Sequence, residues 1–255
     1  MSKAALTQYF DVAQLVLYMF WIFFAGLIWY LSRENRREGY PLDNDRGVVM
    51  NGWMALPEPK MYKLGDGREV WIPDGKVSPQ TLNATPLAPH GGAAYEPTGN
   101  PMLAGVGPGA WADRSDEPDL DPEGHPKIRP MSLLDGYAVN PRDPDPRGQP
   151  VLDARGKVAG TVVELWLDVP EASIRYLEVE VPAGGGTRRV LLPITFARIT
   201  GSGQVKVHAV LAPHFADVPG LKGKDSITLL EEERIQSYFG AGLLYAEPAR
   251  AEPLI

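Results

Sequence analysis

The stretch IRYLEVEV, residues 174–181, alternates apolar and charged side chains along most of its length. In an extended chain Leu177 and Val179 fall on one face, and Glu178 and Glu180 fall on the other. This period of two predicts a β-strand with one buried face and one solvated face.

Stretches of similar character lie on both sides of it. Residues 183–186, Ala-Gly-Gly-Gly, predict a tight turn between this strand and the next. The other predicted strands are rich in β-branched residues: VAGTVVELWLDV (158–169), TRRVLL (187–192), ITFARIT (194–200) and QVKVHAV (204–210). Short strands with tight connections predict a small antiparallel β-barrel or sandwich.

One helix is predicted after these strands. Asp225 or Ser226 can cap its first turn, and Thr228 and Glu231 have the spacing of a capping box. Gly240 is the expected end of the helix.

A strongly apolar segment lies near the N-terminus. Residues 12–31, VAQLVLYMFWIFFAGLIWYL, contain eighteen apolar side chains in twenty. As a helix this stretch measures roughly 30 Å, the thickness of the hydrocarbon core of a bilayer. We expect a transmembrane helix over 12–32 rather than a cleaved signal peptide. The stretch is too long for a signal peptide, and its C-terminal end has large residues instead of the small ones of a cleavage site. No ionisable side chain lies between Asp11 and Arg33, so the helix alone provides no path for protons or ions.

The residues that flank this segment predict its orientation. Only Lys3 precedes it, whereas several basic residues follow it, which places the C-terminal side in the cytoplasm and residues 1–11 in the periplasm. The predicted membrane-interface residues at the C-terminal end are aromatic or basic: Trp29, Tyr30, Arg33, Arg36 and Arg37.

The chain between the apolar segment and the strands is rich in proline and glycine. Residues 73–150 contain fifteen Pro and ten Gly, too many for long helices or central strands. Spaced large apolar residues argue against a disordered linker and favour an ordered coil lying on a partner surface. We expect an extended segment with short strands over 33–130, including a hairpin that turns at 65–67, and a barrel domain with the C-terminal helix over 131–255.

Composition excludes several classes of protein. The chain has no cysteine, which excludes disulfides and thiolate metal sites, and the four histidines do not have metal-ligand spacing. The formal net charge of −7 lies after the apolar segment, since Lys3 and Asp11 cancel, and it argues against nucleic acid as a partner. His208 is expected to lie in a strand with a structural role.

Two groups of titratable residues stand out. One places a charged or ionisable side chain at every second position and would present all of them on one side of an extended chain: Asp119, Asp121, Glu123, His125 and Lys127. It is either a polar surface loop or a patch that collects protons. In the other, Glu171 and Arg175 either form an ordinary loop ion pair, or Glu171 is a buried acid that relays protons. The pair Glu178 and Glu180 could serve two-carboxylate hydrolysis, but a solvated strand face explains it better.

Six segments occur in the order in which one known family has them: FWIFFAGLIWYL, ENRREGYPL, GVGPGAW, DPEGHPKIRP, VPEASIRYLEVEV and LLEEERIQSYFGAGLLY. Together they resemble the H subunit of the photosynthetic reaction centre of purple bacteria, nearly from end to end. The resemblance implies a PRC-type β-barrel beneath the membrane-embedded L and M subunits.

This resemblance also implies partners and cofactors. L and M would carry bacteriochlorophyll, bacteriopheophytin, quinones and non-haem iron, and the present chain would bind none of them directly. It would be a non-catalytic subunit that caps the quinone side and conducts protons to the secondary quinone. The location would be the bacterial inner (intracytoplasmic) membrane, among lipids and with a cytochrome subunit or light-harvesting antenna in the same complex.

Position by position, the resemblance assigns Glu171 and Arg175 to the neighbourhood of the secondary quinone. It assigns Asp121, His125 and Lys127 to the region where protons are taken up from water. Where many relatives have a second histidine this chain has Glu123, which weakens any two-histidine surface metal site. The alternatives are a membrane-tethered β-barrel adaptor that recruits a soluble protein and a membrane-bound hydrolase that uses Glu178 and Glu180.

Overall fold

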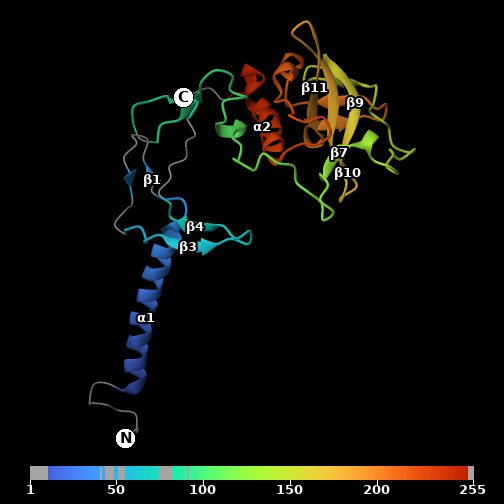
Figure 1. Ribbon diagram of the computed structural model, residues 1–255. Coiled ribbons are helices and arrows are strands. Elements are labelled where there is room, and N and C mark those ends of the chain that lie inside the picture. Colours follow the sequence, from blue (N-terminus) through green and yellow to red (C-terminus); the bar gives the residue numbers. More distant parts are fainter. Residues whose placement is uncertain are drawn as a thin grey trace. The chain divides into compact units, whose positions relative to one another are not determined.

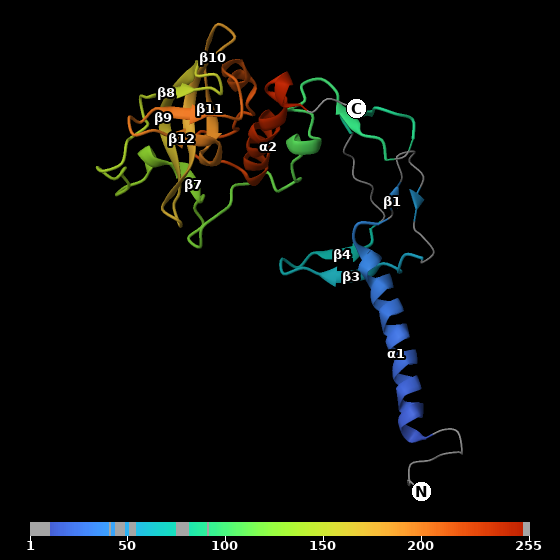
Figure 2. The same ribbon diagram turned by 180° about the vertical axis from the view of Figure 1, so that it is seen from behind.

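The structure is a computed structural model that describes residues 11–40, 42–43, 49–50, 55–74, 82–90 and 92–251. It consists of two compact units, which are described separately. The first contains residues 1–80 and 88–94, and the second contains residues 81–87 and 95–255. Figures 1 and 2 show the elements of each unit from opposite sides.

Helix α1 (Val12–Glu34) is the predicted apolar helix. The Asp11 carboxylate caps it by accepting a hydrogen bond of 2.8 Å from the Gln14 backbone N–H. No residue of α1 is buried, and in the described part of the chain it is the only helix long and apolar enough to cross a membrane. The helix over 12–32 is therefore confirmed, with an end two residues further on, while residues 1–10 of the expected periplasmic segment lie outside the described residues.

The predicted hairpin follows in the same unit. Strands β3 (Lys60–Lys63) and β4 (Glu69–Ile72) pair in antiparallel register. Gly67 has a φ of +85°, a conformation that a glycine adopts without strain, and its N–H bonds to the Leu64 carbonyl at 3.0 Å. The other elements of this unit are η1 (Asn35–Arg37) and the pair β1 (Leu42–Asp43) and β2 (Val49–Met50).

The second unit is built on a seven-stranded sheet with the order β11-β10-β9-β8-β13-β12, in which β7 also pairs with β9. Its strands are β7 (Ile128–Pro130), β8 (Pro150–Leu152), β9 (Val158–Asp168), β10 (Ser173–Ala183), β11 (Gly186–Pro193), β12 (Ala197–Ile199) and β13 (Val205–Val207). A separate pair consists of β5 (Ala84–Pro86) and β6 (Tyr95–Pro97). The short helices are η2 (Gly107–Gly109), η3 (Met131–Leu133), η4 (Ile194–Phe196), η5 (Ala212–Asp217) and η6 (Pro248–Arg250).

This sheet confirms a mainly β fold but differs from the expectation in detail. β8 and β13 pair in parallel, and among the described strands β11 and β12 remain the two ends of the sheet without pairing to each other. The strand predicted over 194–200 begins as the helical turn η4, which leaves only β12 extended. The strand predicted over 204–210 ends at Val207, so the placement of His208 in a strand is wrong, and its side chain is exposed.

The core lies between the inner face of the sheet and helix α2 (Leu229–Tyr245). From the sheet side it contains fully buried residues such as Val162, Leu165 and Leu177. From α2, Phe239 stacks on Phe196 with ring centroids 5.7 Å apart. Burial of this apolar surface is what holds the helix on the sheet.

The capping box of α2 is confirmed, but its expected ends are wrong. Thr228 is the N-cap, rather than Asp225 or Ser226, and Thr228 and Glu231 bond to each other's backbone N–H groups at 3.1 and 2.9 Å. The helix continues through Gly240 to Tyr245. In this last part of the helix, glycine is needed at Gly242 because Ala209 and Val210 pack closely against it, and not because the helix ends there.

Part of the Pro/Gly-rich segment packs on α2 of the same chain. The Leu229 N–H donates to the Glu117 carbonyl at 3.0 Å, and the Arg234 guanidinium lies 5.6 Å from the centre of the Trp111 ring. The prediction of an ordered coil is confirmed for this part, and the surface that orders it belongs to the chain itself. A partner for the segment as a whole stays a prediction, and residues 75–81 and 91 lie outside the described residues.

Two neighbouring glycines of α2 give a matched test of this packing. A Cβ at Gly242 would lie 2.5 Å from Val210 Cγ1 and 2.8 Å from the Ala209 carbonyl oxygen, whereas a Cβ at Gly240 would meet only the Pro108 oxygen, at 3.4 Å. Gly242→Ala should therefore lower the free energy of unfolding by about 1–3 kcal/mol through overpacking. Gly240→Ala should leave it unchanged or raise it by up to about 1 kcal/mol, because alanine favours a helix. Urea denaturation followed by near-UV circular dichroism measures both, and equal effects would contradict the close packing at Gly242.

Candidate functional site

A polar cleft of about 400 Å³ lies where β7, β9 and β10 meet the first turns of α2. Charged side chains dominate its lining: Arg114, Asp119, Lys127, Ile128, Asp168, Arg175, Leu229, Glu232, Glu233 and Gln236. Three of the residues singled out in the sequence, Asp119, Lys127 and Arg175, therefore share one cleft. Asp168 and Glu232 join them without having been predicted.

The loop over 119–127 folds back on itself rather than running extended. The Lys127 N–H donates to the Asp119 carbonyl and the Asp121 N–H donates to the His125 carbonyl, both at 2.8 Å. The His125 N–H in turn donates to the Asp121 carboxylate at 2.7 Å. The expectation that all five alternating side chains lie on one side of an extended chain is therefore wrong, because the chain reverses at Glu123 and its neighbours.

This reversal divides the predicted collector into two parts. Asp119 and Lys127 form the base of the loop and line the cleft, where their side chains bond at 2.7 Å. That hydrogen bond lowers the pKa of Asp119 and raises the pKa of Lys127. Glu123 and His125 are exposed at the tip, with His125 Nδ1 3.7 Å from the Asp121 carboxylate.

Asp168, the last residue of β9, is the buried acid of this region. Its side chain is only 11% exposed, and Arg175 Nε lies 3.8 Å from its Oδ2. Glu171 lies on the exposed turn between β9 and β10, where its backbone N–H makes a long contact of 3.4 Å to Asp168 Oδ1. The alternative of a loop ion pair between Glu171 and Arg175 is thus wrong, because Arg175 lies beside Asp168. Glu171 is not buried within the chain itself, and its role as a proton relay stays a prediction. The sequence signal that could have identified Asp168 is its position at the end of the apolar run LWLDV, where it is the one carboxylate.

Glu232 is the acid on the helix side of the cleft. The Tyr176 hydroxyl donates to Glu232 Oε2 at 2.8 Å, and Tyr176 itself is fully buried. Burial raises the pKa of the Glu232 carboxyl despite this hydrogen bond, and burial also raises the pKa of the Tyr176 hydroxyl. Sequence reasoning could not select Glu232 from the run EEE, since only the packing of α2 turns one of these side chains towards Tyr176.

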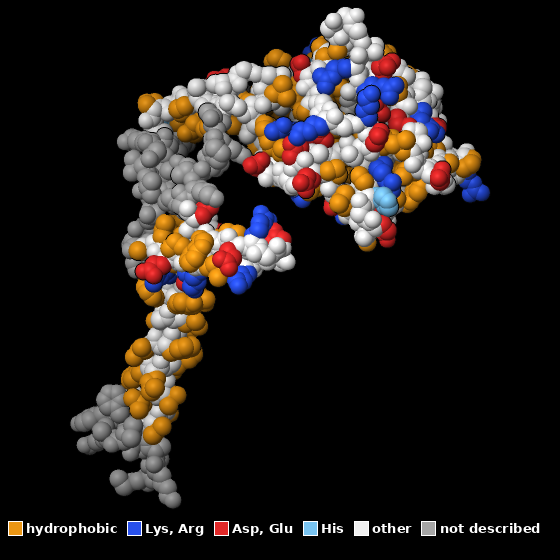
Figure 3. All heavy atoms as spheres, in the orientation of Figure 1, with side chains coloured by type: hydrophobic (Ala, Val, Ile, Leu, Met, Phe, Trp, Pro, Cys, Tyr) orange, Lys and Arg blue, Asp and Glu red, His pale blue; other side chains and the backbone are white. Residues whose placement is uncertain are grey.

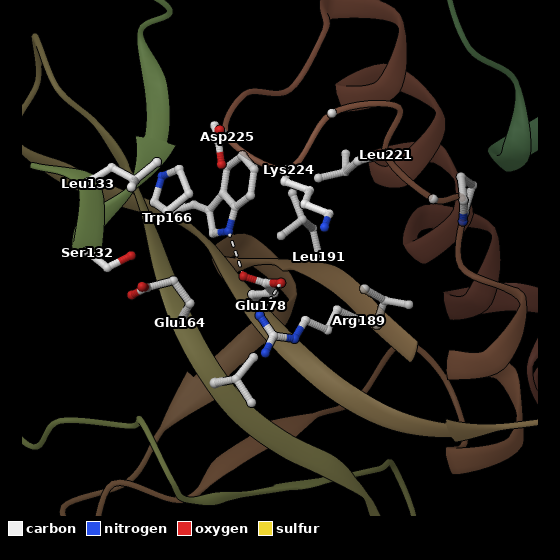
Figure 4. Close-up of a pocket in the computed structure, with 16 residues that line it drawn as sticks. Ser132, Leu133, Glu164, Trp166, Glu178, Arg189, Leu191, Leu221, Lys224 and Asp225 are labelled. Atoms are coloured by element: carbon white, nitrogen blue, oxygen red, sulfur yellow. Dashed lines mark hydrogen bonds and ion pairs between the residues drawn. The ribbon is translucent and has the colours of Figure 1, made fainter. Parts of the chain in front are cut away.

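A second cleft, of about 620 Å³, lies on the outer face of the sheet (Figure 4). The Trp166 indole N–H donates to Glu178 at 3.3 Å, and an Arg189 N–H donates to the other oxygen at 3.5 Å. Glu178 is only 15% exposed, so its assignment to a solvated face is wrong. Glu164 lines this cleft with Glu178, whereas Glu180 does not, so the structure does not bring the two predicted hydrolytic carboxylates into one cleft.

The predicted membrane-interface residues divide into exposed and buried ones. Trp29 and Tyr30 are exposed, and the Arg33 guanidinium lies 5.8 Å from the centre of the Trp29 ring. The Arg36 guanidinium lies 5.4 Å from the Tyr40 ring. Figure 3 shows hydrophobic side chains along the length of α1 and basic ones gathered at its end.

Arg37 differs from the other interface residues because it is buried at 9% exposure. Its guanidinium bonds to both Glu34 carboxylate oxygens and to the carbonyls of Glu58 and Ile72. The side chain of Arg37 therefore joins the end of α1 to the hairpin, and its place at the membrane interface stays a prediction.

A mainly β domain tethered to a single apolar helix defines a membrane-anchored β-domain chain. Family models identify it further: one described as PRC-barrel domain matches residues 142–210, and one described as photosynthetic reaction centre, H-chain N-terminal region, matches residues 4–133. The second match covers half of the chain. The chain therefore belongs to the photosynthetic reaction centre H-chain family.

Membership of this family makes the chain a subunit of a photosynthetic reaction centre, a membrane complex that contains L and M subunits and carries pigments and quinones. Its role there is that of a structural subunit. That the pigments, quinones and iron all bind to L and M stays a prediction, as does the domain boundary between residues 130 and 131.

Glu232 supplies a pH-dependent test of the cleft. A carboxyl with a raised pKa still holds its proton in the folded state where the unfolded chain has lost it, so it reduces stability as the pH rises above the ordinary value of 4.5. Glu232→Gln removes this penalty. Relative to the unchanged chain, its free energy of unfolding should therefore increase between about pH 4 and about pH 7.5.

The matched control is Glu233→Gln, the same change at the next position, which also lines the cleft. Urea denaturation across this pH range should show the trend for Glu232→Gln only. A difference from the unchanged chain that does not vary with pH would contradict the raised pKa of Glu232.

Proposed function

We propose that this subunit caps the quinone side of the L and M subunits and conducts protons to the secondary quinone. The observation that supports this most strongly is the cleft in which Asp119, Lys127, Asp168, Arg175 and Glu232 gather. The larger cleft on the sheet also contains ionisable groups, but they make up a smaller share of its lining.

The chemistry of the quinone requires such a cleft. Reduction to the quinol consumes two electrons and two protons, and a subunit that covers the quinone side must let those protons pass. Ionisable side chains at successive depths can take up a proton and release it inward, whereas an apolar cover would exclude it. The quinone, when bound to its own subunits, supplies the redox chemistry, and this chain passes on protons that it takes up from water.

The tip of the 119–127 loop is the proposed uptake region. Glu123 and His125 present a carboxylate and an imidazole to water, and the largely buried Asp121 carboxylate lies 3.7 Å from His125 Nδ1. An imidazole exchanges protons near neutral pH. Asp119 and Lys127 at the base of the loop then connect this tip to the cleft.

The inner part of the path consists of Asp168, Glu232 and Glu171. Glu232, with its raised pKa, accepts a proton more readily than an ordinary glutamate does. Glu171 is exposed in the chain by itself, three residues after the buried Asp168, and the family resemblance assigns it to the neighbourhood of the secondary quinone. An exposed carboxylate next to a buried one is suited to pass a proton to a subunit that covers it. Arg175 positions Asp168 within this path.

The proposed setting is the bacterial inner (intracytoplasmic) membrane, with the N-terminus in the periplasm and both the cleft and the barrel domain in the cytoplasm. The excess of basic residues after α1 supports this orientation. Lipids are proposed to surround the exposed apolar surface of α1, and a cytochrome subunit or light-harvesting antenna is a proposed neighbour in the complex.

Replacing acids by amides of the same shape tests the path. In assembled complexes, Glu171→Gln and Asp168→Asn should leave primary charge separation unchanged, because the pigments are not affected. Each should slow the second electron transfer to the quinone, with its proton uptake, by about tenfold or more, since an amide cannot carry a proton. Flash spectroscopy with a pH-indicator dye measures both steps.

Glu180→Gln is the matched control, since Glu180 is on β10 but outside the cleft. It should show the rates of the unchanged complex. Normal proton uptake in Glu171→Gln and Asp168→Asn would contradict the proposal that these residues carry protons, and it would not affect membership of the family.

A further inference from the structure

The β3–β4 hairpin is tied firmly to the end of α1. Arg37 bonds to the Glu58 carbonyl, just before β3, at 2.6 Å and to the Ile72 carbonyl, at the end of β4, at 3.1 Å. The same guanidinium bonds to Glu34 at 2.9 and 3.0 Å, and Lys60 Nζ adds a contact of 2.7 Å to Glu34. Both ends of the hairpin are therefore held at the last turn of the apolar helix.

Figures 1 and 2 show how the hairpin leaves the helix. It runs across the direction of α1 rather than along it, and in both views β3 is the strand nearer to the helix. A helix that crosses a bilayer therefore holds this hairpin along the membrane surface, with one edge, β3, towards the lipid.

The hairpin exposes large apolar side chains on both faces. Met61 and Trp71 are opposite each other in the strand register and are 40% and 56% exposed, and Tyr62 on the other face is 42% exposed. An isolated two-stranded hairpin is marginally stable in water, and such side chains favour an environment less polar than water.

The sequence of β3, Lys-Met-Tyr-Lys, has the chemistry of the bilayer interface. Tyrosine places its ring among headgroups with the hydroxyl towards water, and lysine binds lipid phosphate. Lys63 is 72% exposed and only loosely paired, with Nζ 3.9 Å from Glu69, so its ammonium is accessible to a phosphate. Trp29 and Tyr30, near the end of α1, lie at the same boundary.

We propose that strand β3 lies in the lipid headgroup layer, where Met61 and Tyr62 contact the bilayer interface and Lys63 binds lipid phosphate. The hairpin is thereby a second membrane contact that fixes the rotation of the first unit about the axis of α1. This inference rests on the proposed crossing of the membrane by α1, but on no part of the proton path. The occupant is lipid rather than a protein surface, because a strand edge directed at the membrane brings side chains of both its faces into the same layer.

The absence of cysteine allows a direct measurement on the full chain. Single-cysteine variants Met61→Cys, Tyr62→Cys and Trp71→Cys are labelled with an environment-sensitive fluorophore and reconstituted in vesicles that contain brominated lipids. Phe23→Cys, within α1, serves as the control for the membrane span. Val158→Cys, 63% exposed in the other unit, serves as the control for water.

We expect labels at 61 and 62 to show blue-shifted emission and quenching by brominated lipid, and the label at 71, on the far strand, to show less of both. A blue shift of the emission at only one of positions 61 and 62, without quenching by brominated lipid, would indicate contact with a protein surface. That result would overturn the proposal. So would labels at 61 and 62 that match the water control while Phe23→Cys is quenched, a result that leaves the span intact. Absence of quenching at Phe23→Cys would overturn the span and this inference together.

Lys63→Gln tests the phosphate contact separately. With the label at 62, quenching by brominated anionic lipid should exceed quenching by brominated zwitterionic lipid, and Lys63→Gln should remove the difference. Lys206→Gln, an exposed lysine on β13, is the matched control and should retain it. An unchanged anionic preference in Lys63→Gln would contradict the role of Lys63.

Discussion

Strand β9 imposes the constraint on which the second unit depends, because it pairs with three strands at once. One edge bonds to β10, while the other bonds first to β8 and then to β7. The register with β10 shifts twice, and these bulges bend both strands so that successive partners can reach the same edge. As a result Asp168, the last residue of β9, lies opposite Ile128 of β7 and Ser173 of β10. The position of the cleft follows from this meeting of three strand ends.

The first turn of α2 supplies the second fixed point. A helix begins with backbone N–H groups that have no partner inside the helix, and they must be satisfied when the end is buried. The capping box satisfies part of this requirement, and the carbonyls of Ser115 and Glu117 accept from Leu230 and Leu229 at 3.2 and 3.0 Å. These bonds explain how a segment rich in proline, which forms only short regular elements, is nevertheless held in place. They also hold the chain that leads into the 119–127 loop next to Glu232.

The sequence was most informative where a local pattern determines the structure. The alternation in 174–181, the capping box at Thr228 and the apolar run of α1 all act over a few residues, so the strand, the capping box and the apolar helix were predictable. The site depended on long-range packing and was predicted only in part. Nothing local to Asp121 or His125 shows that the loop reverses, and no spacing shows that Arg175 pairs with Asp168 rather than Glu171. Arg37 was assigned to the membrane interface from its charge alone, whereas its guanidinium donates to backbone carbonyls 21 and 35 residues away in the sequence.

The acids of the cleft differ in their surroundings, and therefore in how strongly each one holds a proton. Asp119 has an ammonium at hydrogen-bond distance, which stabilises its charged form, so it gives up a proton readily. Glu232 has only the neutral Tyr176 hydroxyl at that distance and is partly buried, so it holds a proton more tightly. In the proposed path, a proton that enters from the loop would therefore move towards the helix side, where its binding is stronger. Transfer onward would then require a stronger base or a developing negative charge, which an electron arriving on the quinone would provide.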